Sequence, residues 1–147
     1  MRTDYALRAL FTLVENYGGD PVSIPELARR NHVPKRFLEH IMLDLKQGGW
    51  VSSVVGKYGG YLLARSPEQI TVGEVVRSFD GYLAPLPCVS VTNYKCCSQE
   101  SMCRFRHLML KTRNAVAQLM DESSLADVAR GYPVSAGELE YRGGEGI

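Results

Sequence analysis

The sequence predicts a mainly α-helical protein with one small β-hairpin and a long helix near the C-terminus. Three observations support this fold class. Apolar residues recur every three to four positions in several separate stretches, which is the period of an amphipathic helix. Two β-prone runs flank a glycine-rich turn in the first half of the chain. A stretch of about 20 residues with the helical period follows after residue 101.

The first predicted helix ends at Gly18-Gly19, because glycine readily adopts the left-handed conformation that closes helices. A second helix begins at Ser23, where Ser-Ile-Pro-Glu forms a capping box with a proline in the first turn. It should stop near Asn31, before Pro34. The apolar stripe of the first helix consists of Ala6, Leu7, Leu10, Leu13, Val14 and Tyr17.

A third helix is predicted from Pro34 to Gly48-Gly49. Its buried stripe consists of Phe37, Leu38, Ile41, Met42 and Leu45, and its other face carries Lys35, Arg36, Glu39, His40 and Asp44. Two helices joined by a short turn, the second with basic and polar residues near its N-terminus, form the helix-turn-helix arrangement. The hairpin of residues 50–64 follows at once, with Lys57 and Tyr58 in its turn. The sequence therefore predicts a winged helix-turn-helix.

The charge distribution agrees with a DNA-facing surface in this region. Seven basic and two acidic residues lie between Arg29 and Arg65, an excess of five positive charges in a chain of net charge +1. A local basic segment in a balanced protein fits nucleic-acid binding. A solvated basic face without a function is the alternative. Lys46 and Arg65 are expected to contact phosphates or to be plain solvated charges.

Residues after the hairpin predict a helix, a loop and two further helices. Thr71-Val-Gly-Glu74 is another capping box and opens a helix that ends near Gly81. Residues 82–102 lose the period, so this loop should need a ligand or a partner chain for its order. The long helix from about Met102 to Asp121 spans roughly 30 Å. Because a small domain cannot cover its apolar stripe, we expect a homodimer. A capping box at Ser124 starts the last helix.

These elements predict four parts. Residues 1–81 form the winged domain, 82–102 a cysteine-rich loop, 103–132 the dimerisation helix with a short C-terminal helix, and 133–147 a flexible tail. No stretch approaches the roughly 20 apolar residues of a membrane span. The N-terminus lacks the apolar core of a signal peptide, so we expect a cytoplasmic protein without a membrane partner.

The chain resembles the Rrf2 family of bacterial transcription regulators, which includes iron–sulfur regulators, nitric-oxide sensors and repressors of cysteine metabolism. The matching segments are 4–10, 34–39, 56–63, 71–75 and 124–128. The resemblance implies a homodimer on a double-stranded DNA operator, with a repressor among the possible roles. The DNA contacts that it implies are Lys35, Arg36, Glu39 and His40 in the major groove, and Lys57 and Tyr58 of the wing at the minor groove. Val55 replaces an arginine of many relatives, so their operator sequence does not transfer.

The four cysteines all lie between residues 88 and 103. In a cytosolic chain such a cluster indicates metal or redox chemistry more than disulfides. In sensing members of the family, three cysteines before the dimer helix hold an iron–sulfur cluster. Cys88, Cys97 and Cys103 fit that pattern, and Cys96 is the substitute for Cys97. The resemblance implies a 2Fe–2S cluster in preference to 4Fe–4S, with an apo form after cluster loss.

The fourth ligand has two candidates. Asp4 matches an aspartate that the partner subunit donates in the nitric-oxide sensors. His107 lies one position after the histidine ligand of the iron–sulfur regulators, where this chain has Arg106. Each candidate also has an interpretation without a metal. Asp4 is then an acid that favours the positive end of the helix dipole, and His107 is then a partly exposed surface residue.

Other interpretations of the cysteines stay open. They include a zinc site, a metal-free thiol switch and no sensing role. We expect no enzyme activity. A thiol enzyme would need Cys103 and His107 as its pair, and these residues are better suited as ligands. A protein-interaction adaptor built on a winged helix is the third class.

Overall fold

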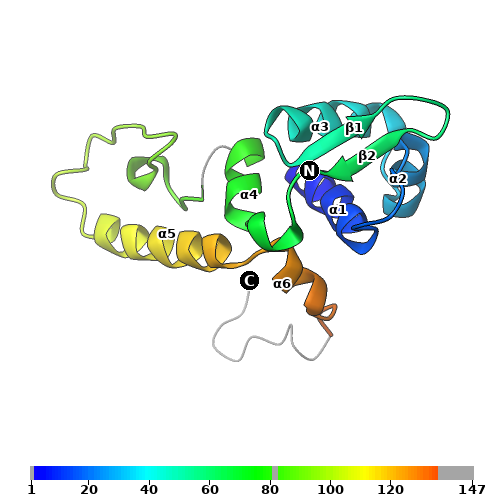
Figure 1. Ribbon diagram of the computed structural model, residues 1–147. Helices are drawn as coiled ribbons and strands as arrows, with labels where there is room; N and C mark the ends of the chain where they lie inside the picture. The colour runs from blue at the N-terminus through cyan, green and yellow to red at the C-terminus, as the bar shows by residue number, and fades with distance from the viewer. Residues whose placement is uncertain (1, 81–82, 136–147) are drawn as a thin grey trace.

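The computed structural model describes residues 2–80 and 83–135, and its architecture is the predicted mainly α-helical fold with a two-stranded antiparallel hairpin (Figure 1). In chain order the elements are α1 (Arg2–Glu15), α2 (Ile24–Asn31), α3 (Lys35–Gln47), β1 (Val51–Val54), β2 (Gly60–Leu63), the 3-10 turn η1 (Pro67–Gln69), α4 (Val72–Asp80), the 3-10 turn η2 (Pro87–Val89), α5 (Phe105–Glu122) and α6 (Leu125–Arg130).

The helix ends lie close to the predicted positions because local chemistry sets them. Gly18 has a φ of +83° in the turn that follows α1. The Ser23 hydroxyl accepts a hydrogen bond from the Glu26 N–H at 3.4 Å and caps α2. His32 closes α2 in the left-handed conformation, with a φ of 52°. Pro34 precedes α3, whose first turn has no side-chain cap.

The buried face of α3 confirms the predicted stripe with one exception. Leu38, Ile41, Met42 and Leu45 are at most 2% exposed. The prediction that Phe37 belongs to this stripe is wrong, because its side chain is 60% exposed. The four buried residues already fill the arc of α3 that faces the core. Phe37 lies at the edge of that arc, where it lines a surface groove instead.

The hairpin is attached to the segment before α2. Val51 pairs with Leu63 and Val54 with Gly60. Val22 and Tyr61 exchange two backbone hydrogen bonds of 3.0 and 2.8 Å, so the segment before α2 adds a short bridge to the hairpin. A Cβ at Gly60 would lie 2.4 Å from the Val22 carbonyl oxygen, so only glycine permits this close approach.

An internal carboxylate connects the hairpin to α4. One oxygen of Glu74 accepts hydrogen bonds from Trp50 Nε1 at 2.7 Å and from Arg65 Nη2 at 2.5 Å. The Glu74 N–H donates to Thr71 Oγ1 at 3.3 Å, which is one half of the predicted capping box. The carboxylate half is used by the tertiary contact. At the start of α6, by contrast, Ser124 and Asp127 form both halves of the box.

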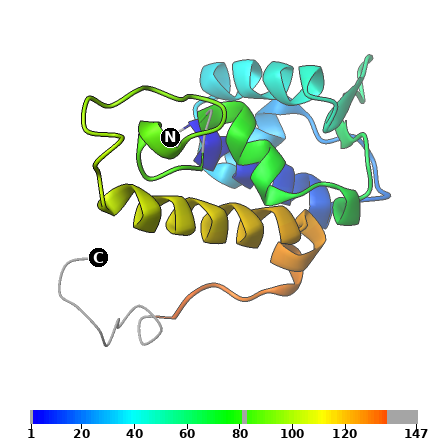
Figure 2. The same ribbon diagram turned by 90° about the vertical axis from the view of Figure 1, so that its left-hand side faces the viewer.

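The two C-terminal helices join the winged domain at the start of α4. The Val72 N–H donates to the Ser123 carbonyl, and the Leu125 N–H donates to the Ile70 carbonyl, both at 2.8 Å. Arg77 of α4 forms an ion pair with Asp121 of α5. Leu125 is 4% exposed and belongs to the same core as the residues of α1 and α3. From this joint α5 extends away from the winged domain (Figures 1 and 2).

The long helix α5 contains no buried residue, although it is 18 residues long. Phe105, Leu108 and Leu119 are each more than half exposed, as is Met102 just before the helix. Residues 83–102 contain one 3-10 turn and otherwise irregular structure, as predicted for a loop. Most of the predicted tail, residues 136–147, lies outside the described residues. No helix among the described residues has the length and apolarity needed to cross a membrane.

Candidate DNA-binding surface and cysteine site

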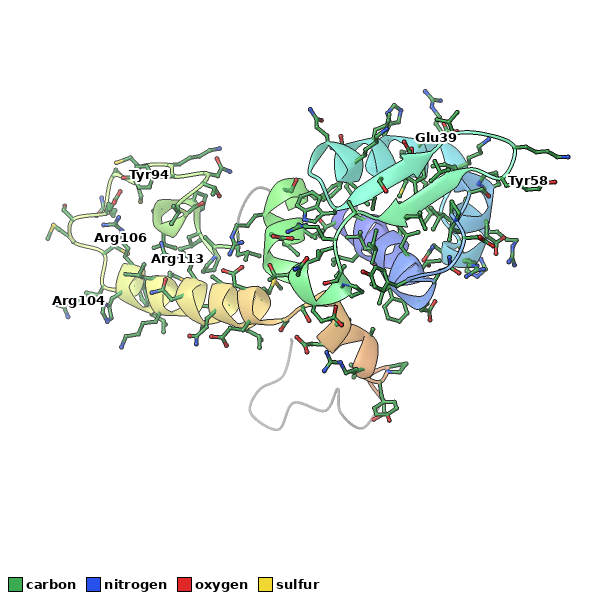
Figure 3. The ribbon with its side chains drawn as sticks, viewed as in Figure 1. Glu39, Tyr58, Tyr94, Arg104, Arg106 and Arg113 are labelled. Atoms are coloured by element: carbon green, nitrogen blue, oxygen red, sulfur yellow. The ribbon has the colours of Figure 1, made fainter. Side chains whose placement is uncertain are left out.

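The predicted DNA-reading residues of α3 share one exposed face of the helix. Lys35, Arg36, Glu39 and His40 are all exposed, on the side opposite the buried stripe. Lys35 Nζ lies 3.8 Å from a Glu39 carboxylate oxygen, one helical turn away. Figure 3 shows Glu39 projecting from α3 toward solvent. The face therefore presents donors and acceptors to whatever approaches it.

The wing tip lies at the same end of the molecule as α3. Tyr58 is 82% exposed at this tip (Figure 3). The Lys57 ammonium lies 5.4 Å from the centre of the Tyr58 ring, within cation–π range. Gly56 has a φ of +130°, which favours glycine at the turn. Val55 is 96% exposed and gives this hairpin an apolar residue beside its single lysine.

Four of the seven basic residues between Arg29 and Arg65 form ion pairs with carboxylates of the same chain. Glu26 pairs with Arg29 at 2.7 Å and with Arg30 at 2.6 Å. These two guanidinium groups, Arg29 first, lower the pKa of Glu26 to about 2. Arg65 is half-buried and forms an ion pair with Glu74, so it is not the plain solvated charge of one of its two expected roles. Lys46 donates to Ser53 Oγ at 2.6 Å.

The cations left for DNA are therefore fewer than the sequence count indicates. Among the described residues of α3 and the wing, three basic side chains have no carboxylate within ion-pair distance: Arg36, Lys46 and Lys57. Lys46 is bound to Ser53 Oγ, which leaves Arg36 on α3 and Lys57 on the wing. We expect these two side chains to dominate the electrostatic part of DNA binding.

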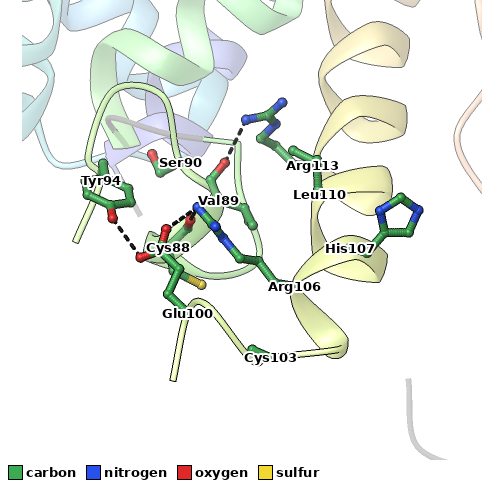
Figure 4. Close-up of a pocket in the computed structure, with 10 residues that line it drawn as sticks. All are labelled: Cys88, Val89, Ser90, Tyr94, Glu100, Cys103, Arg106, His107, Leu110 and Arg113. Atoms are coloured by element: carbon green, nitrogen blue, oxygen red, sulfur yellow. Dashed lines mark hydrogen bonds and ion pairs between the residues drawn. The ribbon is translucent and has the colours of Figure 1, made fainter. Parts of the chain in front are cut away.

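Two of the four cysteines line one pocket at the far end of α5. Cys88 of η2 and Cys103, just before α5, are half-buried and line a pocket of about 490 Å³ (Figure 4). Cys96 and Cys97 are exposed on the intervening loop and do not line it. The described structure therefore brings Cys88 and Cys103 together and leaves the predicted middle ligand, Cys97 or Cys96, at the surface.

Arginines of α5 attach the cysteine segment to the helix. Arg106 donates to the Cys88 carbonyl at 3.3 Å and Arg113 donates to the Val89 carbonyl at 2.9 Å (Figure 4). Arg106 also forms an ion pair with Glu100. The Tyr94 hydroxyl donates to the other oxygen of Glu100 at 2.7 Å, which lowers the pKa of Glu100 and raises that of Tyr94.

Sequence patterns do not predict this network. Arg106 stands out only because relatives have a histidine ligand at its place, and Arg113 and Glu100 belong to no pattern of their own. An arginine that donates to a distant backbone carbonyl leaves no periodic signal in a sequence. The one available signal is the departure from the family's pattern at position 106.

The donor chemistry of the segment fits an iron–sulfur cluster, because thiolates are the ligands that such clusters require. The geometry fits only in part. Within the described residues, no three His, Cys, Asp or Glu side chains are close enough together to hold a metal ion. His107 lines the pocket, but its ring projects to the other side of α5 from the Arg106 side chain (Figure 4). Asp4 is exposed on α1, bound to Arg8 at 2.8 Å, and does not line the pocket.

Comparison with known proteins assigns the fold to a family. The Rrf2 family model, described as "Iron-dependent Transcriptional regulator", matches residues 1–131. This chain belongs to the Rrf2 family. An rrf2-like HTH-type transcriptional regulator of Rhodobacter capsulatus is 40% identical over 138 residues, a match that covers 89% of this chain and 92% of the relative.

Two solved structures of Rrf2-family regulators agree with this fold. CymR of B. subtilis superposes with a TM-score of 0.74 at 27% identity, covering 88% of this chain and 93% of that one. IscR of T. potens gives a TM-score of 0.70 at 28% identity, covering 87% and 82%. The winged helix-turn-helix and the family assignment predicted from the sequence are thus confirmed, and the chain is similar to DNA-binding transcription regulators.

Proposed function

We propose that this protein is a homodimeric regulator of transcription that binds a DNA operator through α3 and the wing. Its cysteines would sense redox, iron or nitric-oxide status and change its affinity for the operator. The observation that carries the proposal is the combination of an exposed polar face on α3, an exposed wing tip and a long helix with no buried residue. Each of these three surfaces is exposed in the single chain. A twofold dimer would cover the long helices, and a palindromic operator would then contact α3 and the wing of both subunits. Its place of action would be the bacterial cytoplasm, and no catalytic role is proposed.

The dimer is supported by the apolar residues of α5. Phe105, Leu108 and Leu119 lie at helical spacing, and the remaining apolar residues of the stripe are only half-buried. An apolar stripe along 18 residues is larger than the scattered single hydrophobic residues of ordinary surfaces. A second α5 packed against it would bury this stripe and set the distance between the two DNA-reading helices.

We assign the predicted parts accordingly. The proposal places DNA binding in residues 1–81, sensing in 82–102 and dimerisation in 103–132. Arg106 and Arg113 hold η2 against α5, while the Val72 and Leu125 backbone contacts hold the other end of α5 against the winged domain. A change in the cysteine segment would therefore act on α5 and, through it, on half-site spacing. A coupling free energy of about 1–3 kcal/mol is the usual scale of such control.

We further propose that Cys88, Cys97 and Cys103 hold an iron–sulfur cluster, with Asp4 of the partner subunit or His107 as the fourth ligand. When bound, the cluster would supply iron and sulfide, whose oxidation or reaction with nitric oxide would alter how the cysteine segment is held. Residues 91–99 are all exposed, so the loop that carries Cys97 has room to turn inward toward Cys88 and Cys103. The family description as iron-dependent and the similarity to IscR support this proposal.

A thiol switch without metal is the second candidate. Cys96 and Cys97 are exposed neighbours, which makes them accessible to oxidants. The similarity to CymR, described as the global cysteine regulator of B. subtilis, favours this alternative. In that case the contacts of Arg106 and Glu100 would transmit a change in the oxidation state of Cys96 or Cys97 to α5.

Anaerobic purification followed by iron and sulfide assay separates these candidates. A cluster predicts visible absorbance and bound iron that Cys88→Ala and Cys103→Ala remove. A thiol switch predicts a colourless protein whose operator affinity changes on oxidation and returns with dithiothreitol. A colourless, iron-free protein that binds DNA equally well after alkylation of all four thiols would exclude both sensing mechanisms.

A further inference from the structure

The exposed face of α3 has an apolar residue at its centre. Leu43 is 57% exposed and stands opposite the buried stripe of Leu38, Ile41 and Leu45. At 100° per residue, positions 36, 40, 43 and 47 share one face of a helix. Leu43 is thus surrounded along that face by Arg36, His40 and Gln47, which are all exposed and polar.

The core does not use this leucine. The residues of α3 that pack inward lie on the other side of the helix, and Leu43 lines none of the described pockets, including the groove that Phe37 and Ile41 line beside α1. Phe37 therefore has apolar neighbours within the chain, whereas Leu43 is directed at solvent from the middle of a polar surface. A single exposed leucine is common on protein surfaces, but this one occupies the surface proposed to face DNA.

We propose that Leu43 reads the 5-methyl group of a thymine in the operator. This inference rests on the proposed function, in which α3 enters the major groove. The thymine methyl is the one methyl group on a base edge there, and the other groups that distinguish the bases are hydrogen-bond donors and acceptors. A polar base edge pressed against Leu43 would lose water without gaining a partner. Leucine at this position therefore favours thymine.

The helix geometry places the thymine relative to the other contacts. Leu43 lies seven residues after Arg36, about 10 Å along the helix axis. Along the DNA axis this is at most roughly three base-pair steps of about 3.4 Å, because α3 need not run parallel to that axis. The thymine should accordingly lie within about three base pairs of the base or phosphate that Arg36 contacts, once in each half-site.

Deoxyuridine substitution tests the contact directly, because it removes the methyl group and preserves base pairing. The probe is a duplex from the region that the protein protects upstream of its own gene, with each thymine replaced in turn. Burial of one methyl group is worth about 0.8 kcal/mol, so we expect about a fourfold loss of affinity for each contacted methyl. The loss should occur at one position in each half-site.

The variant Leu43→Ala tests whether the lost affinity depends on the leucine side chain. This variant should bind the thymine and deoxyuridine duplexes equally well at the sensitive position, while the matched control Val134→Ala, an exposed apolar residue after α6, keeps the full difference. Both residues are at least half exposed, so both variants should fold. A methyl effect that persists in Leu43→Ala, or the absence of any sensitive thymine, would overturn the inference. Failure to protect any specific DNA would instead overturn the proposed function.

Discussion

At the scale of single residues, the helix-turn-helix depends on how α2 is closed at its two ends. Ser23 and the Glu26 N–H close the start, and His32 closes the end with a positive φ. Glu26 then binds Arg29 and Arg30 on the outer surface of the helix. These local contacts fix the direction in which the chain enters α3.

Replacing His32 by glycine should stabilise the protein. A side chain in the left-handed region costs about 1–2 kcal/mol, of which the greater freedom of glycine in the unfolded chain returns a part. We expect His32→Gly to raise the free energy of unfolding by about 0.5–1 kcal/mol, measured by urea denaturation. His40→Gly, within α3, is the matched control and should lower it by about 1 kcal/mol. Equal effects of the two changes would contradict the role of φ.

The carboxylate of Glu26 should contribute stability that depends on pH. Its pKa is lowered from 4.5 to about 2 by Arg29 and Arg30, so the folded state favours the charged form. The contribution is complete above pH 4.5 and disappears as the pH falls toward 2. We expect Glu26→Gln to be less stable than the native protein at neutral pH, with a difference that vanishes in acid. Denaturation midpoints at several pH values check this, and a constant difference would disprove it.

At the scale of secondary-structure elements, α5 combines a fixed end with an uncovered surface. Its C-terminal end meets α4 at Gly73, where a Cβ would lie 2.0 Å from an Asp121 carboxylate oxygen. The rest of the helix is without a buried residue. The contact between Gly73 and Asp121 therefore positions one end of α5, and the apolar stripe along the rest of the helix stays uncovered in the single chain.

The uncovered stripe should be a dimer interface. Leu119→Asp introduces a charge on this stripe, and we expect a folded monomer by analytical ultracentrifugation because Leu119 is 69% exposed in the single chain. A monomer engages only one half-site, so operator binding should weaken by about 100-fold or more. Asn114→Asp, an exposed polar position on the same helix, should remain a dimer. A dimeric Leu119→Asp protein would place the interface elsewhere.

A side chain at Gly73 should displace the Asp121 carboxylate from its ion pair with Arg77. Alanine favours helices over glycine by about 1 kcal/mol, so the loss of this pair should cancel the gain and Gly73→Ala should leave the free energy of unfolding nearly unchanged. In the Asp121→Ala background the same change should raise the free energy of unfolding. A cost independent of Asp121 would show that the methyl group meets a different neighbour. Thermal denaturation of the four proteins completes the cycle.

At the scale of the whole molecule, the proposed DNA binding would combine contacts from α3 and the wing. Lys57→Ala should reduce the slope of log affinity against log salt by about 0.9 for each phosphate that Lys57 neutralises, or about 1.8 for a dimer. Arg29→Ala should leave the slope unchanged, because Arg29 lies on α2, outside the two proposed contact elements, where its side chain is held by Glu26. Fluorescence anisotropy at several salt concentrations measures both, and equal slopes for all proteins would remove Lys57 from the interface.

The sequence predicted the parts of this molecule that depend on neighbours in the chain. Helix ends at Gly18 and Ser23, the hairpin and the family assignment follow from local patterns. The exposure of Phe37 and the pairing of Arg65 with Glu74 were not predictable, because they depend on which surfaces other elements cover. The cysteines were found by composition alone. Their arrangement, with Cys88 held through Arg106 and Cys97 outside the pocket, depends on contacts across an aperiodic loop.

The position of Leu125 in the core has a consequence for how the protein is made. The winged domain begins at the N-terminus, but its core is completed by a residue close to the C-terminus. A nascent chain therefore carries all of α3 before the core that supports it is complete. Chains that end early, through premature termination or proteolysis, lack this closure. They should be degraded instead of competing with intact regulator for its operators.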